Sequence, residues 1–445
     1  MTMPKINQRY AKIVRERYEV NRQSAKAAFD YIRNSTAVCR GEAIPCLYIP
    51  KLFTPEAHDH LNNAAQTICT ILDKVIQRYL TDPDYRKLFP FSPELEELIL
   101  LESGYPQLLP IARLDIFFNE DDFSFQFCEF NADGASAMNE DRELSIALRD
   151  TDAYLQMQQD FTFTPYEYFD SWVHEFMALY ATYNRKVNNP RVIITDFMEL
   201  GTPSEFVVFA EAFRRAGIEA DICEIRDLTY TDGNLCTPDG KRVDAVYRRA
   251  VTRDVMDNAA HVQPFIQAAR DNAACIVGHF RTQIIHNKAT FIILRQPETL
   301  AFLTPHEREY VLRHIPETLW LKKGAFDLDG VLANKDAWII KPDDLYASRG
   351  VFAGVDMTPA QWRDAVLQSM DTNYLLQRFV TPYQSDNVDF MYDEHAAIKP
   401  YNNITGMFVY NGKLQGLYTR MGLMGMIGPE TGNRGVLTLK VEERR

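Results

Sequence analysis

The sequence predicts a protein of the α/β (α+β) class, and two local patterns carry that prediction. Residues 191–225 contain a short apolar run, an amphipathic helix that stops at Gly217 and a second apolar run, the pattern of a parallel strand–helix–strand unit. Residues 110–130 instead alternate with period two around a turn at residues 119–122, which predicts a β-hairpin. At 445 residues, the chain is long enough for about three domains.

The composition is that of a globular protein and argues against several functions. The chain is 46% hydrophobic and 24% charged, so it has ample apolar surface for a large core. Acidic residues outnumber basic ones, 61 to 48, and the net charge of −13 argues against nonspecific nucleic-acid binding. The seven cysteines are odd in number and form no CxxC pair, which favours reduced thiols over disulfides or a zinc ribbon. The charged N-terminus and the lack of a long apolar stretch predict a cytoplasmic protein without a membrane partner.

Three helices are predicted in the first 160 residues. Residues 7–33 are predicted to be a polar helix rich in Arg, Lys, Glu and Gln. Residues 55–79 are predicted to be an amphipathic helix, because apolar residues recur every three or four positions. That apolar stripe contains Leu61, Ala64, Ala65, Ile68, Ile71, Leu72 and Val75. Residues 140–157, after the hairpin, are predicted to be the third helix.

Later elements follow from turns and apolar runs. Two Asp-Gly pairs within residues 227–248 are strong hairpin signals, and so is Asn411-Gly412 nearer the C-terminus. Strands are predicted at residues 337–341 and 374–380, with a helix at 359–370 between them. The glycine- and methionine-rich tail from Gly422 is predicted to be a loop.

Four polar residues of the predicted hairpin are the first candidate site. Arg113 and Asp115 are two apart on a strand, as are Glu129 and Asn131, so each pair shares a face. If the turn folds the strands together, Asp115, Glu129 and Asn131 converge as the oxygen ligands that Mg²⁺ prefers. Arg113 would supply a bidentate donor for phosphate oxygens. The alternative is that these residues only mark the solvent face of a hairpin, and the segment taken alone favours that alternative.

Three other segments carry weaker signals of nucleotide binding. Lys341 ends an apolar strand, and the small-residue loop 347–351 after it could offer backbone N–H groups to phosphates, although the chain has no Walker A sequence. The strand at 374–380 could present backbone groups to an adenine, but taken alone an ordinary core strand is by far the better interpretation. Lys288, in the sequence Asn-Lys-Ala, carries no strong meaning alone.

One motif points to a different chemistry. Residues 326–331 contain the DxDG form of haloacid-dehalogenase-type phosphatases, in which Asp327 would be the nucleophile. That motif should end a buried apolar strand, and the preceding Leu-Lys-Lys-Gly-Ala is not one. We therefore interpret it as an Asp-Gly turn and keep a phosphatase that uses Asp327 as an alternative.

In combination and order, these signals resemble the synthetase domain of the glutathionylspermidine synthetase family. The family's Arg-x-Asp, Glu-x-Asn-Ala-Asp, Asn-Lys-Ala, Lys-Pro with a glycine-containing loop, and Gln-x-Phe motifs are similar to segments that begin at Arg113, Glu129, Asn287, Lys341 and Gln377. The similarity runs from residue 106 to the C-terminus and includes no amidase domain. It implies ATP chemistry without identifying glutathione or spermidine as substrates.

The resemblance implies a circularly permuted ATP-grasp fold with an inserted pre-ATP-grasp-like α/β domain. The metal ligands then precede the phosphate-binding lysines in the chain, the reverse of the usual order. The implied parts are an N-terminal helical region at 1–90, the first ATP-grasp part at 91–160, the inserted domain at 185–272, and the second ATP-grasp part at 273–445.

The resemblance also implies a reaction. An ADP-forming ligase of this kind joins a small-molecule or peptide carboxylate to an amine, such as a polyamine or an amino acid, through an acyl phosphate. The implied metal ligands for Mg²⁺ are Asp115, Glu129 and Asn131, and Arg113 is the implied catalytic residue. The implied ATP-binding residues are Arg113, Lys288, Lys341, Ser348, Arg349, Gly350, Gln377, Arg378, Phe379 and Val380. A nucleotide-binding protein that has lost catalysis is the remaining alternative.

Overall fold

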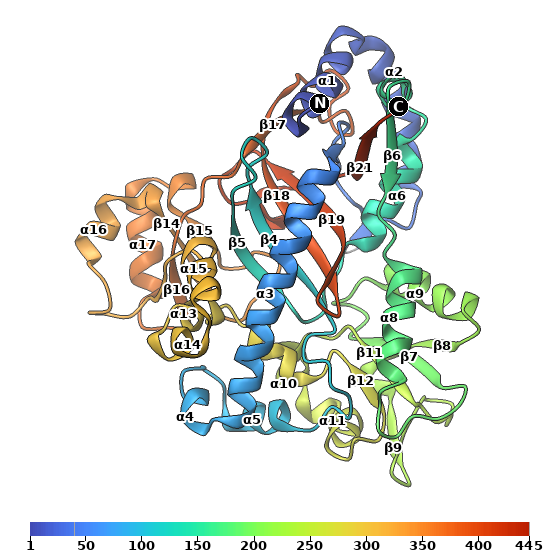
Figure 1. The fold of residues 1–445 in the computed structure, drawn as a ribbon, viewed down its shortest axis with the longest axis vertical. Helices are drawn as coiled ribbons and strands as arrows, with labels where there is room; N and C mark the ends of the chain where they lie inside the picture. The colour runs from blue at the N-terminus through green and yellow to red at the C-terminus, as the bar shows by residue number, and fades with distance from the viewer. Residues whose placement is uncertain (40, 445) are drawn as a thin grey trace.

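A computed structural model describes residues 1–39 and 41–444, and an antiparallel sheet lies at its centre. Its strand order is β20–β19–β18–β4–β5, with β17 paired along β18. The strands are β4 (Ile111–Phe118), β5 (Phe125–Asn131), β17 (Gln384–Asn387), β18 (Lys399–Tyr410), β19 (Lys413–Gly422) and β20 (Arg434–Val436). Helix α3 (Pro55–Thr81) crosses this sheet (Figure 1), and its predicted apolar stripe is buried. The two hairpins predicted around residues 119–122 and Asn411-Gly412 are confirmed.

A bulge in the β4–β5 hairpin decides which side chains face the site. Asp115 pairs with Glu129, but the next residue, Ile116, pairs with Phe127, so Cys128 is the extra residue. Because of that insertion, Phe127 and Phe130 are both buried in the core, while Glu129 and Asn131 lie together on the opposite face.

A second sheet is entirely parallel, with the order β12–β11–β7–β8. It consists of β7 (Arg191–Asp196), β8 (Glu219–Glu224), β11 (Ala245–Arg248) and β12 (Cys275–Val277), with α9 (Pro203–Arg215) joining β7 to β8. The predicted strand–helix–strand unit is therefore confirmed. Of the two Asp-Gly pairs, the first turns the hairpin of β9 (Thr229–Thr231) and β10 (Asn234–Cys236). The second is also a reversing turn, because Cys236 and Arg242 form an isolated antiparallel bridge across it; the strand that follows, β11, then pairs in parallel with β7.

A third, smaller sheet has the order β13–β16–β14–β15 and its own apolar core. It contains β13 (Thr318–Trp320), β14 (Trp338–Pro342), β15 (Phe352–Ala353) and β16 (Tyr374–Arg378), with α16 (Leu328–Ala333) and α17 (Pro359–Ser369) packed on it. In Figure 1 this unit stands at the left, separate from the parallel sheet at the lower right. The predicted strands at 337–341 and 374–380 and the helix at 359–370 are confirmed.

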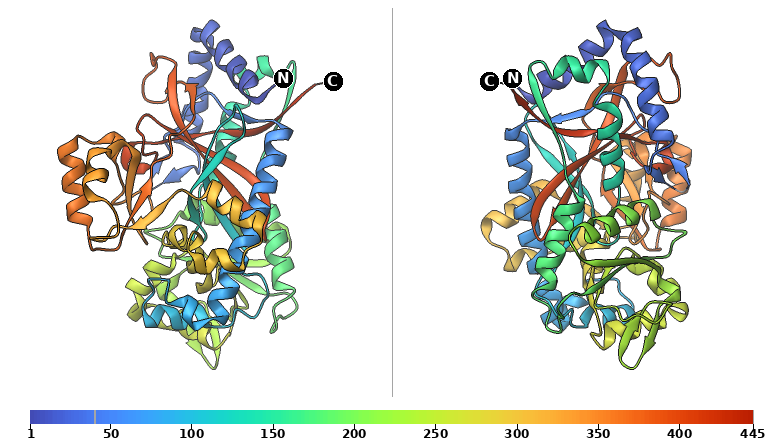
Figure 2. Two further views of the ribbon diagram at one scale, coloured as in Figure 1. Left: turned by 60° about the vertical axis from the view of Figure 1, so that its left-hand side comes forward. Right: turned by 90° about the vertical axis from the view of Figure 1, so that its right-hand side faces the viewer.

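The two ends of the chain meet at a three-stranded sheet, β3–β21–β6 (Figures 1 and 2). Its strands are β3 (Lys51–Phe53), β6 (Phe161–Pro165) and β21 (Thr438–Glu443). The loop predicted from Gly422 is wrong beyond Asn433, because β20 pairs with β19, and β21 pairs with β3 and β6, which are far away in sequence. A reading of local pattern does not detect such distant pairing.

Two helices predicted as continuous are each broken. The helix expected at 7–33 is α1 (Met3–Glu16) followed by α2 (Tyr18–Arg33), and that at 140–157 is α6 (Met138–Leu148) followed by α7 (Asp152–Met157). At the first break, Arg17 leaves helical geometry and donates two hydrogen bonds of 2.8 Å to Asp152 at the start of α7. The break thus coincides with a tertiary ion pair that local pattern does not predict.

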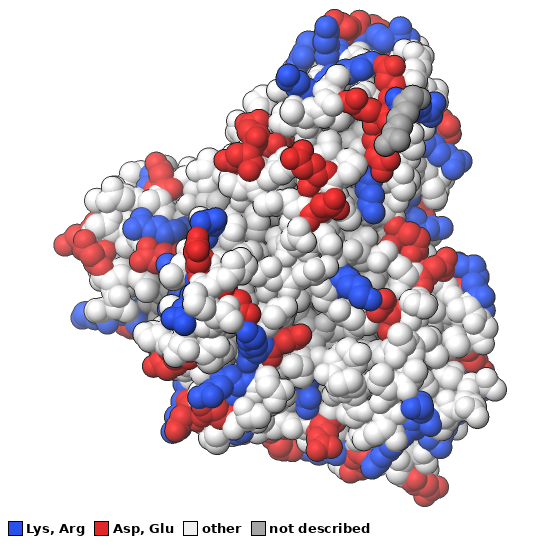
Figure 3. Space-filling model, in the orientation of Figure 1, with Lys and Arg blue, Asp and Glu red and all other residues white. Residues whose placement is uncertain are grey.

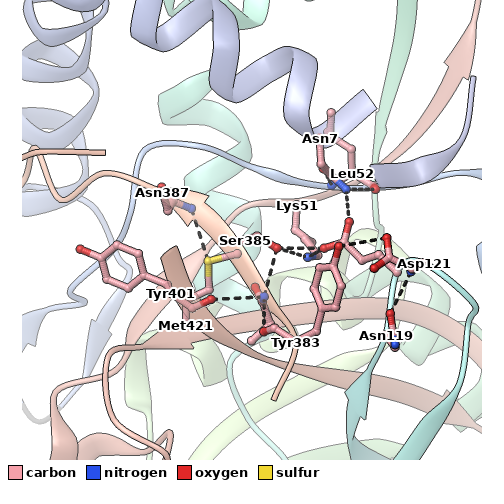
Figure 4. A network of polar contacts seen from close by, with 12 residues as sticks. Asn7, Lys51, Leu52, Asn119, Asp121, Tyr383, Ser385, Asn387, Tyr401 and Met421 are labelled. Atoms are coloured by element: carbon pink, nitrogen blue, oxygen red, sulfur yellow. Dashed lines mark hydrogen bonds and ion pairs between the residues drawn. The ribbon is translucent and has the colours of Figure 1, made fainter. Parts of the chain in front are cut away.

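A buried polar network holds the far end of the β4–β5 hairpin (Figure 4). Lys51 of β3 pairs with Glu120 in the hairpin turn, and both side chains are almost fully buried. Ser385 of β17 accepts from Lys51 at 2.8 Å and donates to Glu120 at 2.9 Å, and Asn7 of α1 donates to Glu120 at 2.7 Å. Because the pair is hydrogen-bonded on both sides, it fixes the hairpin against three other elements.

The remaining elements are short. They are β1 (Val38–Cys39), β2 (Glu42–Ala43), α4 (Pro83–Arg86), α5 (Pro93–Leu100), α8 (Phe169–Tyr180), α10 (Thr252–Asp257), α11 (Gln263–Arg270), α12 (Gln283–His286), α13 (Thr290–Leu294), α14 (Pro297–Phe302) and α15 (Pro305–His314), with short 3₁₀ turns between some of them. Within residues 1–39 and 41–444, no helix has both the length and the apolar character needed to span a bilayer. On the face in Figure 3, acidic and basic side chains are intermixed.

Candidate active site

A cavity of about 470 Å³ lies where the central, the small and the parallel sheets meet. Most of the predicted site residues line it: Arg113, Glu129, Asn131, Lys288, Lys341, Ser348, Gln377, Arg378, Phe379 and Val380. Three do not, namely Asp115, Arg349 and Gly350. The structure therefore brings together residues from segments that are more than 250 positions apart in the sequence.

Asp115 lies behind the cavity wall and holds two arginines. Its carboxylate accepts from Arg113 Nε at 2.8 Å and from Arg420 Nη2 at 2.7 Å, and none of its side chain is exposed. Asn131 Nδ2 donates to Asp115 and to Glu129, both at 3.3 Å. On neighbouring β18, a Cβ at Gly406 would come within 2.8 Å of Arg113 and 2.9 Å of Asp115, so this packing requires glycine. Asp115 thus orients a pair of guanidinium groups along the cavity wall.

Glu129 faces the cavity as an ionised carboxylate. Burial raises its pKa, but the cations of Lys288, Lys341, Arg420 and Arg113 outweigh that effect and hold the pKa at about 2. Lys288 Nζ lies 4.0 Å from Glu129. Since the Asn131 amide nitrogen is used by the two carboxylates, its oxygen remains available beside Glu129.

The site offers a small set of oxygen ligands for a metal ion. Among the residues the structure describes, no group of three or more His, Cys, Asp and Glu side chains could hold a metal. A carboxylate and an amide oxygen from the protein, completed by water and phosphate oxygens, is nevertheless a donor set that suits Mg²⁺. Glu129 and Asn131 fit that description, whereas both oxygens of Asp115 already accept from arginines.

Two lysines of the cavity make hydrogen bonds to neutral oxygens. Lys341, at the end of β14, donates to the Cys128 carbonyl at 3.2 Å. Lys288, just after α12, donates to the Leu345 carbonyl at 2.6 Å, and its own N–H donates to the Asp343 carbonyl. Glu129 acts on both lysines, and Asp343 and Asp344 act on Lys288 as well, but neither ammonium group donates a hydrogen bond to a carboxylate, so both can bind an anion.

The loop after β14 reaches across the cavity to the parallel-sheet unit. Tyr346 donates a hydrogen bond of 3.0 Å to Asp254 of α10, and Ser348 packs so closely on Gly428 that a Cβ there would overlap it. Arg349 instead stacks on Tyr346, with its guanidinium carbon 4.3 Å from the ring centre. Gly350 packs on Tyr374, away from the cavity. Of the three loop residues predicted to bind ATP, the structure places only Ser348 at the cavity.

The strand end at residues 377–380 forms another part of the lining. Gln377 is buried and donates to Thr318 at 2.9 Å. The Arg378 guanidinium lies 4.0 Å from the centre of the Trp338 ring, and the Phe379 N–H donates to the Ala337 carbonyl. These bonds tie the segment to β13 and β14, so it forms a firm edge of the small sheet.

The parallel-sheet unit contributes an acidic wall that sequence reasoning missed. Asp196 ends β7, Asp254 lies on α10, and both line the cavity. Burial raises the pKa of Asp196 to about 7, against an opposing effect of Arg249, and burial also raises the pKa of Asp254. A signal for Asp196 was present, because ligands of α/β sheets bind at the carboxyl ends of the strands.

Other lining residues had weaker signals in the sequence. Arg420 and Tyr418 alternate on the strand after the Asn411-Gly412 turn, but only the sheet register places them beside Asp115. The Tyr418 hydroxyl donates to Glu140, whose pKa is raised by burial. Nothing local marks Cys128 or His286 as cavity residues.

The phosphatase motif has a structural explanation. Asp327 is the N-cap of α16 and accepts from the Gly330 N–H at 3.1 Å, as the Asp-Gly turn interpretation expects. It does not line the cavity.

Comparisons with known proteins show the fold of the chain. No protein-family model and no curated protein sequence matches it. Among solved structures, a glutathione synthetase-like effector from Globodera pallida, in its apo form, is similar with a TM-score of 0.59 and 11% identity, over 94% of this chain and 96% of that one. A protein assigned as a gamma-glutamylcysteine synthetase from Methylobacillus flagellatus KT gives a TM-score of 0.43 and 10% identity, over 88% and 89% of the two chains. The chain therefore has the mixed α/β fold of the effector, with several sheets.

Proposed function

We propose that this protein is an ATP-dependent carboxylate–amine ligase that releases ADP and phosphate. The observation that carries the proposal is the convergence of Arg113, Lys288, Lys341 and Arg420 around Glu129 in one cavity. Cations fixed in advance around a site of developing phosphoryl charge are what γ-phosphoryl transfer requires. The fold shared with a glutathione synthetase-like effector supports the same reaction class.

The permuted arrangement and the domain boundaries belong to this proposal. The hairpin with Arg113 and Glu129 precedes the lysines in the chain, as in the glutathionylspermidine synthetase family. The central and small sheets would form the two ATP-grasp parts, at 91–160 and 273–445. The parallel sheet would be the inserted domain at 185–272, after an N-terminal helical region at 1–90.

Each residue of the cationic wall has a distinct role in the proposed reaction. Lys288 and Lys341 bind the phosphates of ATP as point charges, and residues 377–380 hold the adenine at the edge of the small sheet. Arg113, kept in place by Asp115, holds the carboxylate as it attacks the γ-phosphorus, and Arg420 supports the same oxygens. A planar guanidinium fork suits carboxylate and phosphate oxygens. Glu129 and Asn131 hold Mg²⁺, which when bound neutralises charge on the β- and γ-phosphates.

The opposite wall suits the amine. Asp196 and Asp254 also line the cavity, and their carboxyl oxygens can accept hydrogen bonds from the N–H groups of an amine, which loses a proton before it attacks the acyl carbon. The Tyr346–Asp254 bond and the packing of Ser348 close the loop over the same space and keep water from the acyl phosphate. The carboxylate and amine remain open within the classes of small acids, peptides, amino acids and polyamines.

ADP release across a panel of amino acids, peptides and polyamines tests the proposal. We expect ADP release that depends on both an acid and an amine. With Mg²⁺ and ATP at a hundred times Kd, the free energy of unfolding should rise by about 2.7 kcal/mol, which a thermal-shift assay records as a higher Tm. Lys341→Ala should remove most of that shift, whereas Lys323→Ala, an exposed lysine of the same unit, should keep it. A shift without any turnover would favour an inactive nucleotide-binding protein. No shift in the wild type would contradict the proposal.

A further inference from the structure

Three residues of the cavity lining contain a buried polar atom without a hydrogen-bond partner. Within the part of the chain that the structure describes, these atoms are His286 Nδ1, Ser348 Oγ and Arg249 Nε. More than nine in ten buried polar groups in proteins are hydrogen-bonded, so an unpartnered atom in a residue of the cavity lining calls for an explanation. A ligand that supplies the missing partners is the simplest one.

His286 is the strongest of the three because its whole environment is defined. It ends α12, which packs against β5, and only 8% of the residue is exposed. Its charged neighbours are Asp133 after β5, Asp344 after β14, Glu129 and Lys288. Burial lowers its pKa, so at neutral pH the imidazole is uncharged, with one N–H donor and one acceptor nitrogen.

The carboxylates nearest His286 are already engaged. Asp133 accepts from Arg248 at 2.6 Å and from the Thr252 N–H, and Asp344 accepts from Gln283 at 2.7 Å. Neither forms a hydrogen bond with the imidazole. The ring therefore stays available to the cavity, two residues from Lys288, whose ammonium group is suited to an anion.

On this geometry we propose that His286 is a nucleotide-binding residue that donates a hydrogen bond to a phosphate oxygen held by Lys288 and Lys341. The inference rests on the proposed function, since it takes the anion to be ATP. A phosphate oxygen fits the site because Asp133 and Asp344 beside the ring already accept hydrogen bonds from other groups, which leaves Lys288 as the neighbour able to hold an anion there. A neutral imidazole adds directional bonding there without further charge.

The test is the affinity for ATP and for adenosine, measured by calorimetry on the full chain. His286→Phe keeps the ring but removes both nitrogens, and should weaken ATP binding by roughly tenfold to a hundredfold while leaving adenosine binding unchanged. His286→Asn retains a donor close to the Nδ1 position and should stay within about threefold of the wild type. His279→Phe is the matched control, because His279 is equally buried and unpartnered but does not line the cavity.

The outcomes separate this inference from the proposed function. Unchanged ATP affinity in a folded His286→Phe would overturn the role of His286, and so would an equal loss for adenosine or for His279→Phe, since either would show a merely structural effect. If the wild type itself bound no adenine nucleotide, that result would contradict the proposed function. A selective loss of ATP affinity with rescue by asparagine supports the inference.

Discussion

The two walls of the cavity differ in charge and in the kind of sheet that carries them. Two antiparallel sheets place Arg113, Arg420 and Lys341 along strands, where alternate side chains share a face. The parallel sheet places Asp196 at a strand end, where the chain leaves the sheet. The cations of the antiparallel sheets thus surround Glu129, whereas the parallel sheet brings the buried Asp196 to the cavity beside Arg249.

A second contrast lies within the cationic wall. Asp115 and Glu129 are paired residues of one hairpin, yet Asp115 is sealed behind two arginines while Glu129 faces the cavity. Pairing in a sheet therefore does not make two carboxylates equivalent. We expect the first to act mainly on stability and the second mainly on catalysis.

Asp115→Asn should have the largest effect on folding. The substitution leaves two buried guanidinium groups without their carboxylate, and breaking a buried ion pair costs about 3–5 kcal/mol. Chemical denaturation should show this loss. A variant as stable as the wild type would remove the structural role of Asp115.

Glu129→Gln should cut turnover by roughly a hundredfold, about 2.7 kcal/mol, and lower stability less than Asp115→Asn does. The change keeps the size of the side chain but removes the charge beside the metal and the lysines. The loss of turnover is measured as steady-state ADP release at limiting Mg²⁺, and Glu211→Gln, at an exposed glutamate, is the control. Normal turnover in the Glu129 variant would mean that the hairpin is only a polar surface.

Asp196→Asn should change the pH dependence of stability. The folded protein keeps this proton up to about pH 7, whereas the unfolded chain loses it near 3.8, so the wild type loses stability as pH rises between those values. Asp196→Asn lacks this ionisable group. Its free energy of unfolding should therefore rise by about 2 kcal/mol relative to that of the wild type between pH 5 and pH 6.5. Denaturation curves at the two pH values provide the check. A difference that does not vary with pH would contradict the buried, protonated carboxyl.

Asp327→Asn should have the smallest effect. Asparagine caps a helix about as well as aspartate, so stability should change by less than about 0.5 kcal/mol, and turnover should not change. Loss of activity in this variant, measured in the same ADP assay, would favour the phosphatase alternative. It would also mean that catalysis depends on a residue outside the cavity.

The sequence was sufficient where a local pattern carried the structure. The hairpin with Arg113 and Glu129 and the helix under the central sheet follow from periods of two and 3.6. Predicting that Lys288, Lys341 and residues 377–380 belong to the same site required the family resemblance, because each signal was weak alone. The structure does place them around one cavity, and their roles remain predictions.

Other features depend on contacts between distant segments. The break at Arg17 coincides with its ion pair to Asp152, and the strand that starts at Thr438 pairs with β3 and β6. Arg420 reaches Asp115 only through the register of three strands. None of these contacts leaves a pattern within a short window, so local patterns in the sequence do not reveal them.

The most direct test of the central claim follows oxygen from the acid into phosphate. With the acid identified by the panel and labelled with ¹⁸O in its carboxylate, the ligase should release ADP and phosphate carrying one ¹⁸O. The label moves because the attacking oxygen stays on phosphorus when the amine displaces it from carbon. Phosphate without the label, or labelled AMP with pyrophosphate, would contradict an acyl phosphate formed in this cavity.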